Sequence, residues 1–241
     1  MPQRQRHRGK HPKDNDLFAD KWLPVLRNAV RDLSYLLTQG YAQDPALKLV
    51  GGHHQLAVRQ RRAVLRASCP DESLRRRVDC AVGFDALRAQ DLIVDGYNLL
   101  ITVESVLGHG LLIRGRDGCI RDLASIHGSY HKVEETLPAL GLIGETLHES
   151  SAAHVRWVLD APVSNSGRVK AMIMEEANRH GWPWDVDLAD NVDERISVAD
   201  AVAVTSDGWI LDRAARWTDM VAPIVRKTGR ETDVIDLGPV R

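Results

Sequence analysis

The chain contains 241 residues, of which 44% are hydrophobic and 27% are charged, and its formal net charge is −1. These proportions are those of an ordinary globular protein, with room for one large domain or for a medium and a smaller one. No segment approaches the roughly 20 consecutive apolar residues that span a bilayer, so no membrane partner is expected. The first 16 residues are basic and polar, unlike a secretory signal, and the three cysteines lack CxxC spacing. We therefore expect a cytoplasmic protein without a structural zinc site.

Charge is distributed unevenly along the chain. Residues 1–80 contain 16 Lys and Arg against 8 Asp and Glu, whereas residues 81–241 contain 16 against 25. A basic section joined to an acidic one predicts a part that faces nucleic acid beside a part that collects carboxylates. Chance segregation of surface charge is the alternative.

Residues 1–16 are expected to form a disordered basic arm, and residues 17–80 a small all-α domain. Apolar residues recur at helical spacing from Trp22 to Leu37. A short helix over 46–50, a glycine turn at 51–52 and an arginine-rich helix over 56–67 outline a helix-turn-helix. Its expected contacts with nucleic acid are Arg59, Arg61, Arg62 and Arg66. A plain helical hairpin with these arginines on a solvated face is an equally good interpretation.

The domain junction is expected within residues 69–88, and an α/β domain over residues 88–241. Beyond the junction strands and helices alternate, which indicates a parallel sheet with helices on both faces. The expected strands are 92–94, 154–159 and 201–205, with further candidates at 111–113, 186–188 and 221–225. The expected helices are 99–107, 133–147, 168–179 and 210–217.

Three of these strands end in an aspartate: Asp95 in LIVD, Asp160 in RWVLD and Asp207 in AVAVTSD. The carboxyl ends of parallel strands lie on one edge of a sheet, so these carboxylates are expected to converge there. Like charges repel, and hard oxygen ligands suit Mg²⁺ or Mn²⁺ as the compensating ion. We predict that all three are catalytic metal ligands, with helix capping as the alternative for Asp95. Supporting metal ligands are Asp200 and Asp212, and further candidate acids are Glu104, Asp117, Glu134 and Glu135.

Two polar loops are candidates for contacts with phosphate. PVSNSGR, over 162–168, opens a helix whose N-terminus would attract an anion, with ordinary capping as the alternative. RGRDG, over 114–118, places two arginines beside an acid. The expected phosphate- and RNA-binding residues are Asn98, Arg114, Arg116, Ser164, Asn165, Ser166 and Arg168. A polar cluster at 127–131 includes histidines that are candidates to protonate a leaving oxygen.

The segment DGYN after an apolar strand, and a later strand that ends in TSD with a second Asp nearby, resemble the PIN-like nuclease superfamily, particularly its NYN branch. The two-part layout, with RGRDG, RDLAS, HGSY and PVSNSGR between these strands, resembles an uncharacterised prokaryotic family. That family carries the label domain of unknown function 434 for its helical part, which is joined to a PIN-like part. The family resemblance covers nearly the whole chain, and the PIN-like resemblance covers residues 90–220.

The resemblance implies a PIN-like (Rossmann-like) fold and a metal-dependent endoribonuclease. Its acids correspond by position to Asp95, to Asp160 or Asp200, and to Asp207. The glutamate that the PIN pattern places on an intervening helix has three candidates here: Glu104, Glu134 and Glu135.

We therefore expect a Mg²⁺- or Mn²⁺-dependent phosphodiesterase that hydrolyses RNA, with DNA as the alternative ligand, bound in part through the basic N-terminal domain. The second hypothesis is a non-catalytic nucleic-acid-binding or adaptor protein with an incomplete metal site. The third is a phosphatase or nucleotide hydrolase that uses the same acidic edge. The sequence leaves the oligomeric state open, a homodimer included.

Overall fold

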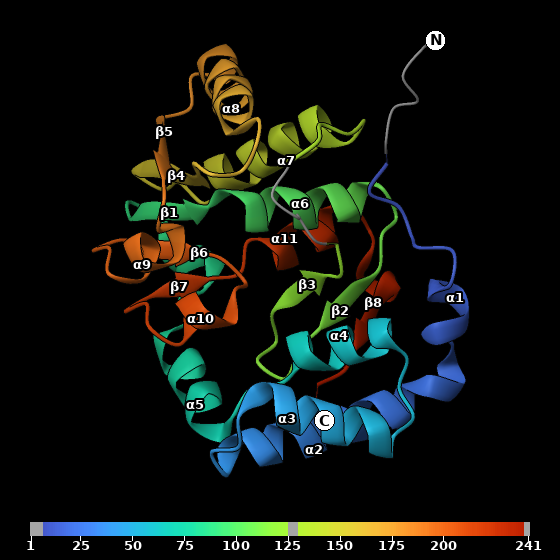
Figure 1. The fold of residues 1–241 in the computed structure, drawn as a ribbon. Coiled ribbons are helices and arrows are strands. Elements are labelled where there is room, and N and C mark those ends of the chain that lie inside the picture. Colours follow the sequence, from blue (N-terminus) through green and yellow to red (C-terminus); the bar gives the residue numbers. More distant parts are fainter. Residues whose placement is uncertain (1–6, 125–129, 239–241) are drawn as a thin grey trace.

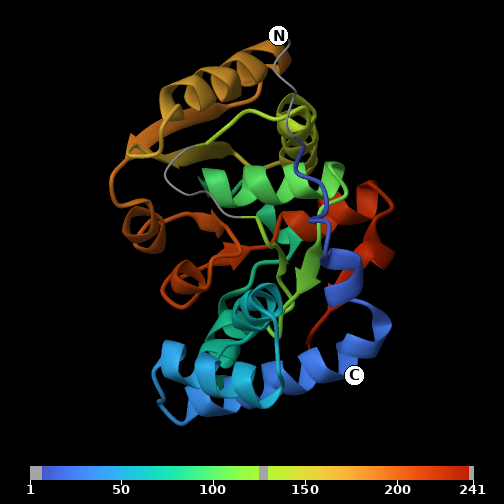
Figure 2. The same ribbon diagram turned by 45° about the vertical axis from the view of Figure 1, so that its right-hand side comes forward.

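The computed structural model describes residues 7–124 and 130–238. The helical part lies below the α/β part in both views (Figures 1 and 2). It comprises α1 (Asp14–Leu17), α2 (Leu23–Thr38), α3 (Gln43–His53), α4 (Val58–Ala67) and α5 (Asp71–Cys80). Within the two described ranges, no helix combines the length and the apolar character that a membrane span requires.

The α/β part is built on a main sheet whose strands follow the order β5-β4-β1-β6-β7. The strands are β1 (Asp91–Asp95), β4 (His154–Asp160), β5 (Trp184–Ala189), β6 (Val202–Val204) and β7 (Trp217–Thr218). Every pairing in this sheet is parallel. The expected parallel sheet is therefore confirmed, and the carboxyl ends of its strands share one edge.

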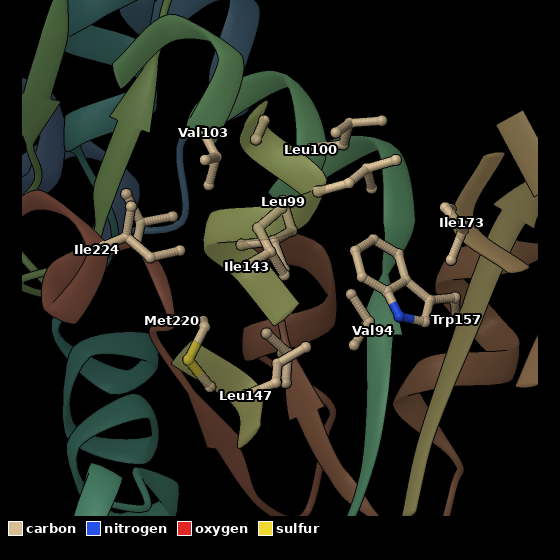
Figure 3. Packing of buried hydrophobic residues seen from close by; sticks show 14 of the residues in the cluster. Val94, Leu99, Leu100, Val103, Ile143, Leu147, Trp157, Ile173, Met220 and Ile224 are labelled. Carbon is tan, nitrogen blue, oxygen red and sulfur yellow. The ribbon is translucent and has the colours of Figure 1, made fainter. Parts of the chain in front are cut away.

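Helices cover both faces of the main sheet, as expected. Leu92 and Val94 of β1 point into the larger core, whereas Ile93 between them points into a smaller core on the other face. Figure 3 shows Val94 and Trp157 in the larger core beside residues of the covering helices. That face is covered by α6 (Gly96–Leu107), α7 (Thr136–Glu149), α8 (Ser166–His180) and α11 (Val221–Lys227), and the other by α9 (Val192–Ser197) and α10 (Gly208–Leu211).

A second, smaller sheet connects the two parts of the protein. Its order is β3-β2-β8, with β2 (Leu112–Arg114), β3 (Ile120–Asp122) and β8 (Val234–Asp236). Leu112 points into the larger core, and its neighbour Ile113 points into the core of the helical part. Because successive residues of a strand face opposite sides, the single short strand β2 contributes side chains to both cores and so connects them.

Residues 7–16 differ from the expected disordered arm. Arg8 Nε donates to the buried carboxylate of Glu104 at 2.9 Å, and His7 Nδ1 lies 2.9 Å from Oε1 of Glu135. Asp14 opens α1 and is buried against Arg59, whose Nη2 donates to it at 2.9 Å. A buried carboxylate is costly unless it is paired, and these ion pairs hold the arm against the protein.

The glycine turn of the predicted helix-turn-helix does not form. Gly51 and Gly52 lie inside α3, and the chain turns instead at Gln55, which has a φ of 51°. A Cβ on Gly51 would lie 2.6 Å from Nε of Arg61, so a larger residue there would require the Arg61 side chain to move. The basic stretch after residue 69 forms the helix α5, which lies within the expected helical domain of residues 17–80.

Two expectations near the C-terminus are also wrong. The apolar run over 221–225 is helix α11 instead of a strand, because Oδ1 of Asp219 accepts from the N–H groups of Val221 and Ala222 at 2.8 and 3.3 Å. The helix expected over 210–217 ends at Leu211, and Trp217 belongs to β7. Side-chain capping and pairing with β6 override the local apolar pattern at these positions.

Arg77 of α5 connects the helical part to two loops of the α/β part. Its Nη1 donates to Asp117 at 2.6 Å, its Nε to Asp212 at 2.7 Å and its Nη2 to the carbonyl of Gly208 at 3.1 Å. Arg121 of β3 donates to both oxygens of Asp117 at 2.7 and 2.8 Å. Burial opposes ionisation of Asp117, but Arg121 and Arg77 outweigh it and lower the pKa of this carboxyl to about 2. We call these four residues the arginine–aspartate network.

Loss of Arg77 should destabilise the whole protein. Arg77→Ala removes one partner from a buried ion cluster, and such changes cost about 3–5 kcal/mol. Arg75 lies on the same helix but is exposed, so Arg75→Ala should change the free energy of unfolding by less than about 0.5 kcal/mol. Urea denaturation of both variants measures the difference, and equal losses would contradict a central role for the network.

Candidate functional site

The strand topology brings three of the predicted aspartates to one edge of the main sheet. Asp95 is the last residue of β1 and lies level with Val158 of β4, so Asp160 at the end of β4 extends two residues further. Asp207 follows three residues after β6, on the opposite side of β1. Sheet order therefore places Asp95 between the other two acids.

A fourth carboxylate, Asp193, belongs to this group and was missed by the sequence reasoning. It lies in the first turn of α9, which follows β5. The residue is exposed, but partial burial of its carboxyl raises its pKa, and the charges of Asp207 and Asp160 raise it further, so the three side chains interact electrostatically. The available signal was that a fourth parallel strand, weakly predicted over 186–188, is followed by an acid at the same edge. We call Asp95, Asp160, Asp193 and Asp207 the acidic edge.

Asp95 is the most deeply buried member of the acidic edge, with 7% of its surface exposed. Burial raises the pKa of its carboxyl to about 7; a hydrogen bond from Thr205 opposes this shift, and the charges of Asp207 and Asp193 add to it. Thr205 Oγ1 donates to Oδ2 of Asp95 at 2.8 Å. A carboxylate that titrates near neutrality at a sheet edge is a candidate functional group.

Capping accounts for Asp95 only weakly. The residue lies at the N-cap position of α6, but its side chain forms no capping hydrogen bond, and the nearby Asn98 backbone only weakly favours the ionised form. The adjacent Gly96 is required by packing, because a Cβ there would lie 2.5 Å from the Leu159 side chain and 2.9 Å from the carbonyl oxygen of Val158. The DG pair therefore brings α6 tightly over β4.

Asp207 does act as a cap. Its Oδ1 accepts from the N–H groups of Trp209 and Ile210 at 2.8 and 3.4 Å, at the start of α10. Capping occupies one carboxylate oxygen, and the residue is only partly buried. Helix capping, which the sequence left open for Asp95, is therefore a role of Asp207, and Asp207 combines it with its place on the acidic edge.

The loop that carries Asp207 is held from three directions. Oδ1 of Asn98 accepts from the N–H and hydroxyl groups of Ser206, both at 3.0 Å. Arg121 Nε donates to the carbonyl of Ser206 at 2.7 Å, and Thr205 hydrogen-bonds Asp95. The predicted phosphate contact Asn98 is thus a positioning residue for this loop, at the acidic edge itself.

Tyr97 contributes a buried hydroxyl without a hydrogen-bond partner among the described residues. Burial raises the pKa of this phenol to about 12, and the charge of Asp160 adds to the shift. The group is therefore a protonated donor near the acidic edge. An unsatisfied buried hydroxyl is costly, and a bound ligand or water would relieve that cost.

None of the four carboxylates of the acidic edge forms an ion pair with a described residue. The negative charge is therefore not neutralised by the protein, and its hard oxygen donors suit Mg²⁺ or Mn²⁺. As the side chains lie, however, no three acidic, histidine or cysteine groups in the described ranges converge to hold one metal ion. Mg²⁺ is commonly bound by one or two carboxylates together with water and substrate phosphates, and Asp95 and Asp207 fit that pattern.

The other predicted metal ligands lie elsewhere. Asp200 precedes β6, and because all strands of the main sheet are parallel, it lies at their amino ends, on the edge opposite to the acidic edge. Asp212 and Asp117 belong to the arginine–aspartate network, where guanidinium groups already neutralise them. The prediction that these three residues lie at the metal site is therefore wrong: strand direction places Asp200 elsewhere, and ion pairs engage Asp212 and Asp117.

The candidate glutamates all bind the N-terminal segment. Glu104 is fully buried between Arg8, Tyr130 and Thr136. Glu134 and Glu135 lie 3.2 and 2.9 Å from the two ring nitrogens of His7. None of the three occupies the acidic edge, so the glutamate implied by the PIN-like resemblance has no counterpart there among the described residues.

Most of the predicted phosphate contacts serve the fold. Arg116 donates to the carbonyl of Cys69 at 2.8 Å and pairs with Asp71, and Arg114 donates to the carbonyl of Gly118 at 3.1 Å. The contacts of Arg116 hold the RGRDG loop on the helical part, whereas Asp117 of this loop is connected through Arg77 and Arg121 to the two residues that flank Asp207. Of the polar cluster at 127–131, residues 127 and 129 lie outside the described ranges.

The PVSNSGR loop keeps some exposed polar groups beside Asp160. Asn165 adopts a φ of 73° at the N-cap position of α8 and donates to the carbonyl of Tyr130 at 3.0 Å. Ser166 is buried and donates to the carbonyl of Ala161 at 3.3 Å, whereas Ser164 and Arg168 are exposed. Ser164, Arg168 and the exposed Asn165 therefore remain accessible to a ligand in the way the sequence predicts.

The predicted basic face of the helical part is largely engaged within the protein. Arg59 pairs with Asp14, Arg61 donates to the carbonyl of Leu56 at 2.9 Å, and Arg66 donates to the carbonyls of Asp122 and Ala124 at 2.6 and 3.3 Å. Each of these side chains, and Arg62, is partly buried. Nucleic-acid binding by this face stays a prediction, and of these four residues Arg66 is the one that lines the same cleft as Asp207.

A cleft of about 590 Å³ separates the helical part from the acidic edge. Gln43, Leu65 and Arg66 line it from the helical part. Asn98, Asp207 and Trp209 line it from the α/β part. We call this space the interdomain cleft, and its size is that of an ordinary ligand site.

Comparison with known proteins divides the chain in the same two parts. Residues 84–223 match a family described as Domain of unknown function (DUF5616), and residues 25–79 match one described as Protein of unknown function (DUF434). An uncharacterised protein of Methanocaldococcus jannaschii is 27% identical over 186 residues, which cover 77% of this chain and 88% of that relative. No solved structure matches the chain. The expected two-part, uncharacterised family is confirmed.

The raised pKa of Asp95 predicts a specific pH dependence of the metal-free protein. The folded pKa, about 7, lies above the unfolded value of 3.8, so this group stabilises the fold fully below pH 3.8. That contribution is lost as the pH rises to 7, a change of about 4 kcal/mol. The Asp95→Asn variant should not show this loss of stability with rising pH.

Urea denaturation with EDTA at pH 4, 5.5, 7 and 8 measures this effect as the difference between wild type and variant. Asp200→Asn, at an exposed acid on the opposite edge, is the matched control and should run parallel to wild type. A constant difference between wild type and Asp95→Asn across this range would show that Asp95 is not protonated in the fold.

Proposed function

The chain belongs to the family described as Domain of unknown function (DUF5616), and from its acidic edge we propose that it is a metal-dependent phosphodiesterase of PIN-like fold, an endoribonuclease acting in the cytoplasm. The observation that carries the proposal is the group of four carboxylates without a protein cation, one of which has a pKa of about 7. Such a group is unfavourable for folding, and a functional role is the simplest reason for a protein to keep it.

The residues of the acidic edge divide the work. Asp95 and Asp207 would hold a Mg²⁺ or Mn²⁺ ion, with Asp160 and Asp193 binding its water shell or a second ion. When bound, the ion would lower the pKa of a water molecule and neutralise charge on the leaving oxygen. Thr205 orients the Asp95 carboxylate through its 2.8 Å hydrogen bond, and Asn98 keeps the Asp207 loop in place.

A phosphate group at this edge would also find hydrogen-bond donors. The protonated hydroxyl of Tyr97 lies near Asp160 and has no described partner; because it is buried, it would reach a phosphate oxygen through a water molecule. Arg168 at the start of α8 is exposed and adds positive charge on the same side of β4. These groups favour a phosphodiester over an uncharged substrate.

A non-catalytic nucleic-acid-binding protein is the second candidate. It is favoured by the absence of any three convergent acidic, histidine or cysteine ligands within residues 7–124 and 130–238, and by the engagement of Glu104, Glu134 and Glu135 elsewhere. This candidate predicts binding of RNA without metal dependence and without cleavage.

Metal binding and cleavage should fail together in variants of the acidic edge. At 100 times its Kd a bound ion stabilises the fold by about 2.7 kcal/mol, or a rise in Tm of about 5–10 °C. Asp95→Asn and Asp193→Asn should reduce this Mn²⁺-induced rise and lower cleavage of a fluorescent single-stranded RNA at least about 100-fold. Asp200→Asn should preserve both.

The measurement pairs thermal melting with and without Mn²⁺ against the cleavage assay. Wild-type protein that binds RNA but shows neither a Mn²⁺-dependent rise in Tm nor cleavage would favour the non-catalytic candidate. Equal effects of Asp95→Asn and Asp200→Asn would place the metal away from the acidic edge.

A further inference from the structure

We propose that the interdomain cleft binds single-stranded nucleic acid, and that Trp209 stacks on a base directly beside the acidic edge. The inference rests on the proposed function, since it assigns the substrate class and a binding residue to the same site. Three features of the cleft carry it: an exposed indole next to Asp207, an arginine stacked on that indole, and a weakly paired arginine on the opposite wall.

The indole of Trp209 lies two residues after Asp207, and its backbone N–H donates to Oδ1 of that aspartate at 2.8 Å. The backbone position of Trp209 is therefore tied to the acidic edge, yet its side chain is 42% exposed and belongs to none of the three hydrophobic cores. Exposure of an indole loses the stabilisation that burial of its large apolar area would provide. A ligand with a flat aromatic face would cover this ring.

Arg213 organises the indole. Its guanidinium carbon lies 3.9 Å from the ring centroid, and its Nη1 donates to the carbonyl of Trp209 at 3.0 Å. Within the described residues Arg213 has no carboxylate partner, so its charge is available to a ligand. The pair offers an aromatic face together with a positive charge, which matches a base and its phosphate.

The opposite wall of the cleft adds a second cation with little neutralisation. Arg66 of α4 is bound by carbonyl groups, and its nearest carboxylate oxygen, on Asp122, lies 3.9 Å away. By contrast, the buried Arg77 and Arg121 deeper in the cleft are closely paired with Asp117. The cations at Arg66 and Arg213 thus flank the cleft, while the deeper pair fixes its floor.

These features favour a single strand over a duplex. The faces of bases in a duplex are covered by their neighbours, whereas an unpaired strand exposes them for stacking on aromatic side chains. Because Trp209 and Asp207 are two residues apart, one base on the indole would set its own backbone phosphate near the acidic edge. The ring would thereby determine which phosphodiester is presented there.

The test measures binding separately from catalysis. Fluorescein-labelled 12-mer RNA and DNA, as single strands and as duplexes, are titrated with protein in EDTA and followed by fluorescence anisotropy. Trp209→Ala should weaken single-strand binding about 5- to 150-fold, the range for loss of one stacked base. Trp209→Phe should retain most of the affinity, and Tyr35→Ala, at an exposed aromatic of α2 outside the cleft, should bind like wild type.

A strand with abasic positions provides the decisive comparison. Its affinity for wild-type protein should fall by a similar factor, and Trp209→Ala should cause no further loss on that strand. Duplex binding should be weaker and insensitive to Trp209. The RNA and DNA arms decide which strand is preferred, and either preference supports the cleft.

The two proposals fail in different ways. Single-strand binding that depends on Trp209, without any Mn²⁺-dependent cleavage, would keep the cleft and overturn the nuclease. Cleavage that depends on Asp95 but has an unchanged KM and Kd in Trp209→Ala would overturn the cleft assignment alone. Absence of single-strand binding, equal affinity for normal and abasic strands, or tighter duplex binding would also overturn it.

Discussion

The interaction on which the rest of the structure depends is the pairing of one buried carboxylate, Asp117, with two guanidinium groups. Arg77 approaches it from the helical part at 2.6 Å, and Arg121 approaches it from the small sheet at 2.7 and 2.8 Å. The same two arginines bind the carbonyls of Gly208 and Ser206, which flank Asp207. Because a buried ion is tolerable only when fully paired, this network sets the position of the acidic loop relative to both parts of the protein.

The network shows that the uneven charge of the chain also has a structural role. The basic first third and the acidic remainder attract one another, and ion pairs from Arg8, Arg66 and Arg77 cross between them. Part of the positive charge that favoured a nucleic-acid-binding domain is therefore used to hold the two parts together. What stays uncompensated is local: the acidic edge, and the cation of Arg213 at the interdomain cleft, where Arg66 is paired only at 3.9 Å.

The cleft places cations on its walls beside a cluster of carboxylates that no protein cation neutralises. This arrangement is unfavourable without a ligand, but it suits a phosphate chain with a bound divalent ion. The arginines and the ion would neutralise the phosphates, and the ion would neutralise the carboxylates. The pKa of Asp95, about 7, connects this arrangement to pH, because metal binding requires the ionised form that burial disfavours. Substrate, ion and carboxylate ionisation are thus expected to be coupled.

The local sequence pattern was sufficient to predict the parallel sheet, its helices on both faces and the position of Asp95, Asp160 and Asp207 at one edge. Each of these acids follows an apolar run, and in a parallel sheet the ends of such runs share one edge whichever strands are neighbours. Only the tertiary structure decided which charged residues remain free. Glu104, Asp117 and Asp212 look like further metal ligands in the sequence, but arginines distant along the chain neutralise them. Asp193 became visible only when the end of β5 was placed beside β4. Ion pairs and close packing join residues that are far apart in the sequence, so they cannot be predicted from a short stretch of neighbouring residues.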